Sequence, residues 1–461
     1  MSFLPPNLAF VAKQMSNYSR NRFRLETNST KNVVKAGDVI TVNLPESALL
    51  DMKSFRWVFE ASSEAGSTSS NLSMFPSNMQ SLIERVEVYI NGVQIMNGAA
   101  QYNTICNVLK IGRSNNDRND SIEACLSKSH VTDQAGTLTS QPLPNESCII
   151  DKWYGFLGET STRFLDTSLL GQIQVRITLA TEKVMIPFQT GSSTGYSVSS
   201  YPANQLNYSL TNIYFTIDSL VVDQMYSMAL RDQLSKNEFI PINYKEYYTY
   251  TLGGQQSTEY QNRFALSSGS IDKIYGITRK ASYNAGTQSA VKLVGDDGTG
   301  AHTDAAAGHD AHVGAYFVFE SFSEDGSSSA DYTGKADNLR YQFSINNVSH
   351  PQYRAQLIEA CADLAYVNDK CGDYSAGILT TSLKHYKKAH CVLPLVLCHP
   401  EQPISVMSGY NSRGINSMMV LEVQGLHSSR VGNSNQYESM VIVETTAQIR
   451  ASSGKSLATS K

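Results

Sequence analysis

Three histidines in the second half of the chain could bind a transition metal. His302, His309 and His312 stand in a segment rich in Gly and Ala, with Asp304 and Asp310 between them. Imidazole and carboxylate groups at such short spacing are common zinc ligands. A metal site also needs neighbours that orient its ligands, and a loop of small residues offers none. We therefore interpret the three histidines as part of an exposed loop and predict no metal site, no cofactor and no catalytic residues.

Two acidic clusters have a similar interpretation. The segment 295–300 (GDDGTG) could hold calcium through carboxylate and carbonyl oxygens, but it lacks the spacing and the later Glu of an EF-hand. Glu320, Glu324 and Asp325 form a second acidic group. We interpret the first as a solvated turn and the second as the edge of a loop.

Cysteine and histidine come together once, where Cys391 and Cys398 bracket an apolar strand pattern next to His399. A nucleophile and its base must meet in space, and no other feature supports such a pair, so we predict buried thiols. The seven cysteines are odd in number and show no CxxC spacing, which favours free thiols in a reducing compartment. Trp57 and Trp153 are typical core or interface anchors.

Signatures of other functions are also missing from the sequence. It contains no GxSxG elbow, Walker loop, HExxH motif or dinucleotide fingerprint, so we do not expect an enzyme. The net charge is −4, with no basic domain, which argues against specific nucleic-acid binding. The N-terminal residues lack the pattern of a signal peptide, and no apolar run reaches about 18 residues.

The composition favours a β-rich protein whose surface packs against other protein surfaces. The chain has 461 residues, of which 41% are hydrophobic and only 17% charged, and it contains 25 tyrosines. Its length predicts two domains of roughly 200 residues each. Charge is depleted and tyrosine enriched at the cores of protein interfaces, so this profile also suits a surface that packs against its own copies.

One strand-and-turn pattern occurs twice. Val86, Val88 and Ile90 alternate with polar residues and lead into Asn91-Gly92, while the sequence YQFSI at 341–345 leads into Asn346-Asn347. Asn-Gly between alternating apolar runs is a strong hairpin signal. A helical pattern follows each hairpin, starting from a tyrosine at 102 and at 353, and a later strand follows a glycine at 171 and at 414. The pair Asp51/Lys53 before the first tryptophan strand also resembles Asp272/Lys273 before a strand of the second half. The repeat predicts a duplicated β domain.

The connections between these strands favour one β architecture. Long loops and a helix after one hairpin fit an eight-stranded jelly roll better than an immunoglobulin sandwich, which has short, regular connections. We predict an all-β fold of two tandem eight-stranded jelly rolls with short connecting helices and long loops. The expected segments are an N-terminal arm (1–20), jelly roll 1 (21–225), a linker helix (226–240), jelly roll 2 (241–450, with an insertion loop at 280–338) and a polar C-terminal tail (451–461). Within them we also expect a short helix at 8–15, a long polar connection at 113–150 and a strand at 315–321.

In this arrangement the chain resembles the double jelly-roll major capsid proteins. This lineage includes those of adenovirus, membrane-containing phages, giant-virus relatives, virophages and Polinton-like viruses. Three segments carry the resemblance, in the order expected along the chain: LIERVEVYINGV at 82–93, LGQIQVRITL at 170–179 and YFTIDSLVV at 214–222.

The resemblance implies a structural role and a set of partners. It implies a homotrimer that forms a pseudo-hexameric capsomer in the icosahedral shell of a double-stranded DNA virus, made and assembled inside the host cell. Its partners would be neighbouring capsomers and minor capsid proteins such as penton and cement proteins. The N-terminal arm would lie against neighbours or an inner membrane. The loops at 189–207 and 280–338 would form towers, and their exposure leads to the hypothesis that they contact a host receptor.

Two other classes remain as alternatives. A carbohydrate-binding, lectin-like β-sandwich would show a secretion signal and a compact group of aromatics with Asp or Asn, and neither is evident. A jelly-roll enzyme such as a cupin would carry clustered His and Glu on core strands, but the histidine cluster lies in a predicted loop.

Overall fold

The structure is a computed structural model that describes most of residues 19–460. The longer segments outside the described residues are 1–18, 65–70, 97–100, 112–145, 190–200, 203–206, 222–227, 236–238, 282–286, 293–311, 324–337, 369–385, 400–403 and 453–456. Shorter gaps are 29–30, 77, 229, 231, 233, 289, 388, 415–416, 429–430, 433–435 and 461.

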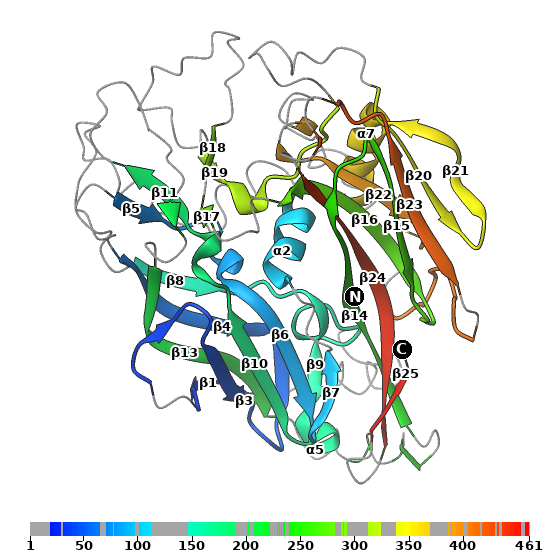
Figure 1. Ribbon diagram of the computed structural model, residues 1–461. Helices are drawn as coiled ribbons and strands as arrows, with labels where there is room; N and C mark the ends of the chain where they lie inside the picture. The colour runs from blue at the N-terminus through cyan, green and yellow to red at the C-terminus, as the bar shows by residue number, and fades with distance from the viewer. Residues whose placement is uncertain are drawn as a thin grey trace.

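Jelly roll 1 consists of two antiparallel sheets (Figure 1). The β1 sheet has the strand order β1-β13-β4-β8, and the β3 sheet has the order β3-β10-β6-β7. Short strands β2 and β9 pair with β13 and β4 at the margin of the β1 sheet. The strands are β1 (Ser19–Glu26), β2 (Val34–Lys35), β3 (Val39–Asn43), β4 (Leu49–Glu64), β6 (Ile83–Ile90), β7 (Val93–Met96), β8 (Glu146–Ile150), β9 (Phe164–Asp166), β10 (Ile173–Leu179) and β13 (Asn207–Val221).

Jelly roll 2 repeats this arrangement with the later strands. The β14 sheet has the order β14-β24-β16-β22, and the β15 sheet has the order β15-β23-β20-β21. The strands are β14 (Phe239–Gln255), β15 (Glu259–Ala265), β16 (Ile271–Lys280), β20 (Arg340–Ile345), β21 (Val348–Gln356), β22 (Val392–Val396), β23 (Met418–Gln424), β24 (Tyr437–Ser452) and β25 (Leu457–Ser460), which pairs with β24. Each half thus has eight principal strands in matching order, and the predicted pair of tandem jelly rolls is confirmed.

The period-two pattern explains how each jelly roll builds its core. Ile173, Val175 and Ile177 of β10 have no exposed surface, while the residues between them reach solvent to different degrees. They pair with Ile90, Val88 and Val86 of β6. Burying such a side chain stabilises the fold by about 1.5–3 kcal/mol, and a one-residue slip in register would turn the whole set toward water.

Equivalent asparagines close the two hairpins. Asn91 has φ of 49° and Asn346 has φ of 48°. The Asn91 side chain accepts a hydrogen bond from the Gln172 amide (3.1 Å), and the Asn346 side chain accepts one from the Met418 amide (3.1 Å). Each asparagine therefore also links its turn to the next strand of the sheet, which supports the predicted repeat at the level of single side chains.

Helices and small sheets lie at the ends of the jelly rolls. The helical elements are η1 (Met79–Leu82), α2 (Tyr102–Ile111), η2 (Gly155–Leu157), α5 (Thr167–Leu170), η3 (Glu182–Val184), η7 (Ala315–Phe317) and α7 (Leu357–Asn368). The small sheets pair β5 (Asn71–Met74) with β11 (Ile186–Gln189), β12 (Tyr201–Pro202) with β17 (Thr287–Gln288), and β18 (Ala290–Lys292) with β19 (His312–Gly314). Through β12 and β17, the two predicted tower loops pair with each other.

Several local predictions were wrong. The helix of the second half starts at Leu357, so Tyr353 belongs to strand β21. Part of the predicted strand at 315–321 is the 3₁₀ turn η7. Residues 457–460, which were assigned to a polar tail, form β25, and Ser19 and Arg20 of the predicted arm belong to β1. The remaining arm residues and the helix expected at 8–15 lie outside the described residues.

Candidate assembly surface

The two jelly rolls meet along the free edge of β14. The Lys245 amide donates to the Glu159 carbonyl oxygen (3.0 Å), and the Ser161 amide donates to the Asn243 carbonyl oxygen (2.7 Å). The Thr160 backbone forms an antiparallel bridge with that of Tyr244. A short segment of jelly roll 1 therefore continues the β14 sheet of jelly roll 2. This pairing satisfies backbone groups that an edge strand would otherwise expose.

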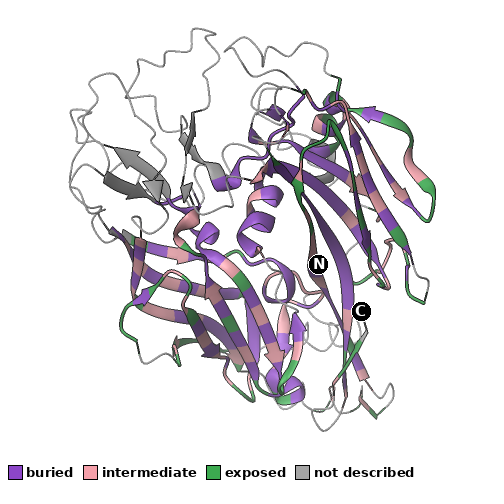
Figure 2. Ribbon diagram, viewed as in Figure 1, coloured by how far each residue is buried: buried purple, intermediate pink, exposed green. Residues whose placement is uncertain are grey.

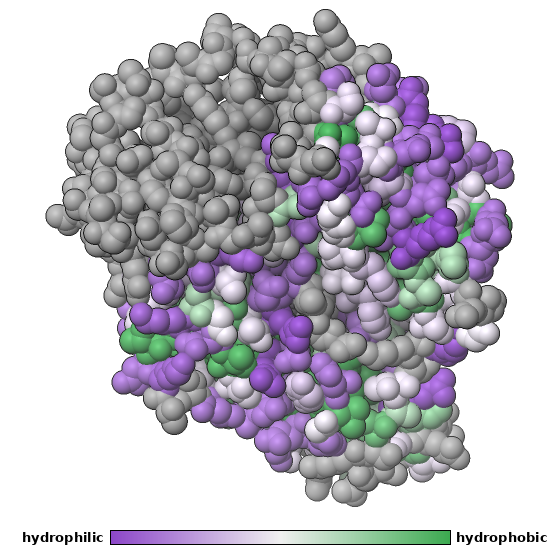
Figure 3. Space-filling model, viewed as in Figure 1, coloured by the Kyte–Doolittle hydropathy of each residue, from purple (hydrophilic) through white to green (hydrophobic). Residues whose placement is uncertain are grey.

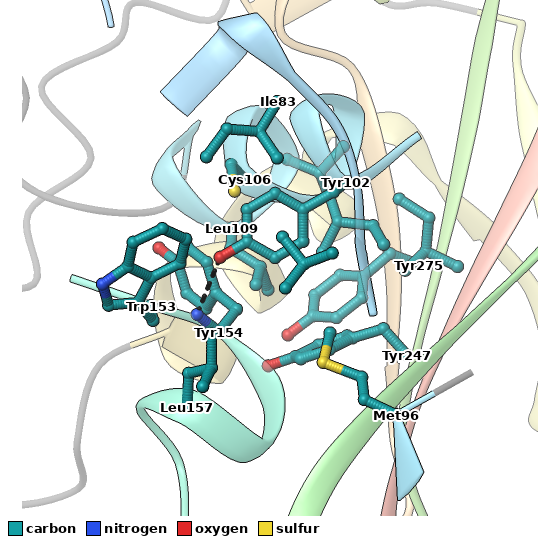
Figure 4. Close-up of a cluster of buried hydrophobic side chains, with 14 of the residues drawn as sticks. Ile83, Met96, Tyr102, Cys106, Leu109, Trp153, Tyr154, Leu157, Tyr247 and Tyr275 are labelled. Carbon is teal, nitrogen blue, oxygen red and sulfur yellow. Dashed lines mark hydrogen bonds between the residues drawn. The ribbon is translucent and has the colours of Figure 1, made fainter. Parts of the chain in front are cut away.

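Aromatic side chains fill the space beside this edge (Figure 4). Tyr102 and Tyr154 come from jelly roll 1, and Tyr247 and Tyr275 come from jelly roll 2; all four are buried. The rings of Tyr154 and Tyr247 meet edge to face, with centroids 6.3 Å apart. Buried aromatic contacts of this kind add about 0.5–1.5 kcal/mol each to area burial, so the junction is a continuous core and not a loose linker contact.

A charged cluster lies next to the aromatic cluster. Lys245 Nζ lies 2.6 Å from an Asp272 oxygen and 3.0 Å from a Glu444 oxygen. Thr446 also donates to Asp272 through its hydroxyl (2.6 Å). Burial disfavours the charge of Glu444, but Lys273 and Lys245 outweigh it, so the pKa of Glu444 is lowered. This carboxylate stays ionised inside the junction.

Glu159 adds a carboxylate from jelly roll 1 to this cluster. It accepts hydrogen bonds from the Gly155 amide (2.9 Å) and the Tyr247 hydroxyl (2.8 Å). Although the residue keeps some exposed surface, its carboxylate is enclosed. Burial, followed by repulsion from Glu444, raises the pKa of Glu159 to about 6. The junction therefore contains a group that titrates near neutral pH.

Jelly roll 1 has an equivalent charged cluster on its β1 sheet. Arg20 lies 3.2 Å from an Asp51 oxygen and 2.5 Å from an Asp218 oxygen, Arg22 lies 2.7 Å from Asp218, and Arg163 lies 2.8 Å from Asp51. Hydrogen bonding from Arg22 is the main reason that the pKa of Asp218 is lowered. The likeness of Asp51 and Asp272 was visible in the sequence, and both prove to be buried carboxylates that bind a cation from the first strand of their sheet.

The two equivalent sheets differ in what covers their outer faces. In β24 every residue from Tyr437 to Ala447 is buried, so this strand of the β14 sheet is covered on both faces. In β1 no residue is buried, and β13 alternates between buried and more exposed positions over much of its length. Figure 2 shows the same contrast between the buried strands beside the junction and the exposed outermost strands. Jelly roll 1 packs on the β14 sheet of jelly roll 2. Its own equivalent sheet, the β1 sheet, has an open outer face.

Most of the polar clusters singled out in the sequence fall on residues that the structure does not describe. His302, His309, the segment 295–300, Glu324 and Asp325 lie outside the described residues, and His312 is the first residue of β19. Glu320 is buried. Among the residues that the structure describes, no group of three His, Cys, Asp or Glu side chains could hold a metal, and no helix is long and apolar enough to cross a membrane.

The cysteine and tryptophan predictions can be placed in the fold. Cys391 is buried, as predicted, whereas Cys398 is only partly buried and burial raises its pKa. The His399 backbone amide donates a hydrogen bond to the Ser408 hydroxyl (3.2 Å). Trp57 and Trp153 are buried in the core, and Trp153 donates to the Phe55 carbonyl oxygen (3.1 Å).

Comparison with solved structures identifies the fold class. The chain aligns with the PBCV-1 virus capsid, as described by a quasi-atomic model, with a TM-score of 0.55 and 13% identity over 96% of this chain and 97% of that chain. PBCV-1 VP54, fitted into a reconstruction of the virophage Sputnik, gives a TM-score of 0.57 and 12% identity over 96% and 97%. The Faustovirus major capsid protein gives 0.53 and 10% over 95% and 91%.

The protein therefore has the double jelly-roll fold that the sequence resemblance implied, over nearly its whole length. No protein-family model and no curated protein sequence matches the chain. At this level of identity, the fold is what the chain shares with these viral proteins.

Proposed function

We propose that this protein is a major capsid protein, located in the capsid shell of a virion, and that its role is structural and not catalytic. In this role it forms homotrimers that act as pseudo-hexameric capsomers, and these assemble into the icosahedral shell of a double-stranded DNA virus. The observation that carries the proposal is the double jelly-roll fold over nearly the whole chain, shared with proteins described as viral capsid proteins.

The surfaces of the chain support an assembly role. An open sheet face with a free strand edge invites pairing with another chain, and the exposed β1 is such a strand. The described part of the face in Figure 3 carries small, scattered apolar patches among polar residues, and no single broad apolar area. Contacts of moderate strength suit a shell, because many of them act together.

Partners beyond the trimer follow from the same proposal. Neighbouring capsomers and minor capsid proteins would contact its sides, and the N-terminal arm would lie against neighbours or an inner membrane. Loops that include the paired strands β12 and β17 would form the outward towers, where a host receptor could be contacted.

Electron microscopy of the purified protein at rising concentration tests the proposal. We expect blocks of hexagonal outline, and sheets or closed shells built from them. A protein that remains as isolated single chains under all conditions would contradict the capsid role and would give preference to the glycan-binding alternative.

A further inference from the structure

One lysine of the junction is buried against two carboxyl groups of its own sheet. Lys245 comes from β14, Glu444 from β24 and Asp272 from the start of β16, so the lysine side chain reaches across the middle strand of the three. The Lys245 side chain is 15% exposed, while those of Asp272 and Glu444 are 2% and 7% exposed. This arrangement puts an amine nucleophile next to a carboxyl electrophile in a site that excludes most water.

Hydrogen bonds hold both oxygens of the Asp272 carboxyl group. Lys245 Nζ lies 2.6 Å from Oδ2, which also accepts a hydrogen bond from the Thr446 hydroxyl (2.6 Å). The Ser270 hydroxyl donates to Oδ1 (2.7 Å), and the Gly409 amide fixes that hydroxyl by donating to it (2.9 Å). Contact with Oδ2 brings Nζ near the carboxyl carbon, and atoms held roughly 3–3.5 Å apart are positioned to react. The Ser270 hydroxyl lies where negative charge would develop if the nitrogen attacked that carbon.

Glu444 supplies a proton acceptor for the amine. Its Oε1 lies 3.0 Å from Lys245 Nζ. Burial disfavours the charge of Lys245, but Glu444 and Asp272 outweigh this effect, so the pKa of Lys245 is raised and the ion pair is the resting state. Proton transfer from the amine to a neighbouring carboxylate produces two neutral groups without changing the net charge, and burial favours neutral forms. The neutral amine is therefore a minor state, and a reaction that passes through it should be slow.

We propose that Lys245 and Asp272 condense into an intramolecular amide crosslink after the chain has folded. The Lys245 ammonium first passes one proton to Oδ2 of Asp272. Nζ then bonds to Cγ, Glu444 takes a second proton from Nζ and returns it to Oδ2, and the Cγ–Oδ2 bond breaks to release water. The third proton stays on the amide nitrogen. One positive and one negative charge disappear together, and no oxidant, cofactor or second substrate is consumed.

The crosslink would tie β14 to β16 across β24, beside the junction between the jelly rolls. Lys245 and Asp272 are 27 positions apart, so the amide would close a loop of that length. Closing a loop stabilises the folded state by restricting the unfolded chain, as a disulfide does. An amide, unlike a disulfide, is not broken by thiols. This inference does not depend on the proposed capsid role.

Jelly roll 1 contains the same cluster with an arginine in place of the lysine. Arg20 of β1 has the position that Lys245 has in β14, because each lies across from the residue two places after the carboxylate of the middle strand. Arg20 lies 3.2 Å from Asp51 and 2.5 Å from Asp218. A guanidinium stays protonated and is no amine nucleophile, so this cluster keeps its ion pairs and forms no amide. Lys245→Arg is therefore a matched control that retains a cation and removes the nucleophile.

Mass spectrometry of the purified full chain tests the inference on the wild-type protein. We expect chains that are lighter than the sequence mass by one water molecule, in a fraction that grows while the folded protein is incubated. Trypsin should fail to cut after Lys245 in this fraction, because the amine is acylated, and a branched peptide should join Lys245 to Asp272. Folded wild type that keeps its full sequence mass throughout the incubation would overturn the inference.

Two variants separate the crosslink from another loss of water. Lys245→Arg should keep the full sequence mass, and Glu444→Gln should slow the loss of water because the proton acceptor is gone. Asp272 could also lose water by cyclising with the backbone amide of Lys273, and this product does not require the Lys245 amine. A loss of water that persists in Lys245→Arg, or an unmodified Lys245 in the lighter wild-type chains, would overturn the inference.

Discussion

At the scale of single residues, the structure concentrates charge where the jelly rolls meet. Glu159 from the first half and Glu444 from the second lie near one another, with Lys245 close to both. The hydroxyl of Tyr247 and the amide of Gly155 donate hydrogen bonds that stabilise the Glu159 carboxylate. These bonds do not fully offset the free-energy cost of burying its charge. Protonation of the Glu159 carboxylate should therefore change the stability of the junction between the two jelly rolls.

Glu159→Gln should remove part of the pH dependence of stability. The pKa of Glu159 is about 6 in the folded protein, against an ordinary value of 4.5, so the folded state binds the proton more tightly than the unfolded state. Wild-type stability should then fall by up to about 2 kcal/mol as pH rises from 4.5 through 6, relative to the glutamine variant. Urea unfolding of both proteins between pH 4.5 and 8 measures this difference, and parallel curves would contradict it.

Asp218→Asn should destabilise jelly roll 1 at neutral pH. The carboxylate is buried, but its partners Arg20 and Arg22 are largely exposed, so we expect a loss of about 1–3 kcal/mol. Because the pKa of Asp218 is lowered, its contribution should be present above the ordinary value of 3.8 and be lost as pH falls below it. Denaturant unfolding checks this, with Glu26→Gln in an exposed pair as the control, which should change stability by less than about 0.5 kcal/mol.

At the scale of elements, the glycines beside the two hairpins show how closely the two jelly rolls match in backbone conformation and in packing. Gly171 and Gly414 precede equivalent strands, and both have positive φ, 83° and 73°. A Cβ atom at Gly171 would lie 2.2 Å from the side chain of Asn91, whereas one at Gly414 would meet nothing within 4 Å. The backbone conformation is repeated, but the close approach is not.

Alanine at these two positions should therefore have unequal effects. Gly414→Ala adds only backbone strain and should cost about 1 kcal/mol. Gly171→Ala also displaces the Asn91 side chain, which bonds to the Gln172 amide and the Leu170 carbonyl oxygen, and should cost about 3 kcal/mol or more. Thermal and denaturant unfolding compare the variants, and equal losses would mean that Asn91 moves aside freely.

The elements that could be predicted are those whose pattern is local. The alternation at 173–179 and the helix at 102–111 appear where their own residues indicate them. Strand β8 was assigned to a loop because its pattern is short, and pairing with β4 determines its structure. Tyr353 was assigned to the helix because its position also fits the helical period, yet it lies in β21, whose residues 348–350 and 355–356 pair with β20.

The junction could not be derived from the sequence. Glu159 and Tyr247 are 88 positions apart, and the sequence pattern around each residue does not indicate that the two side chains meet. Only the likeness of Asp51 and Asp272 gave a signal, and it suggested a repeat without showing what binds these carboxylates. Contacts between distant segments depend on how the sheets pack, and local periodicity carries no information about that packing.

At the scale of the whole molecule, the duplicated fold explains both the internal junction and the open sides. One jelly roll covers the β14 sheet of the other, while the equivalent β1 sheet keeps an open face. The open outer face of the β1 sheet is therefore a surface that another copy could cover.

The mass of the purified wild-type protein in solution, measured by light scattering across a range of concentrations, tests the capsid role most directly. We expect a stable trimer, three times the 50.7 kDa chain, that does not dissociate on dilution to working concentrations and that joins into larger shells at high concentration. A lasting monomer of 50.7 kDa that neither trimerises nor assembles would contradict it.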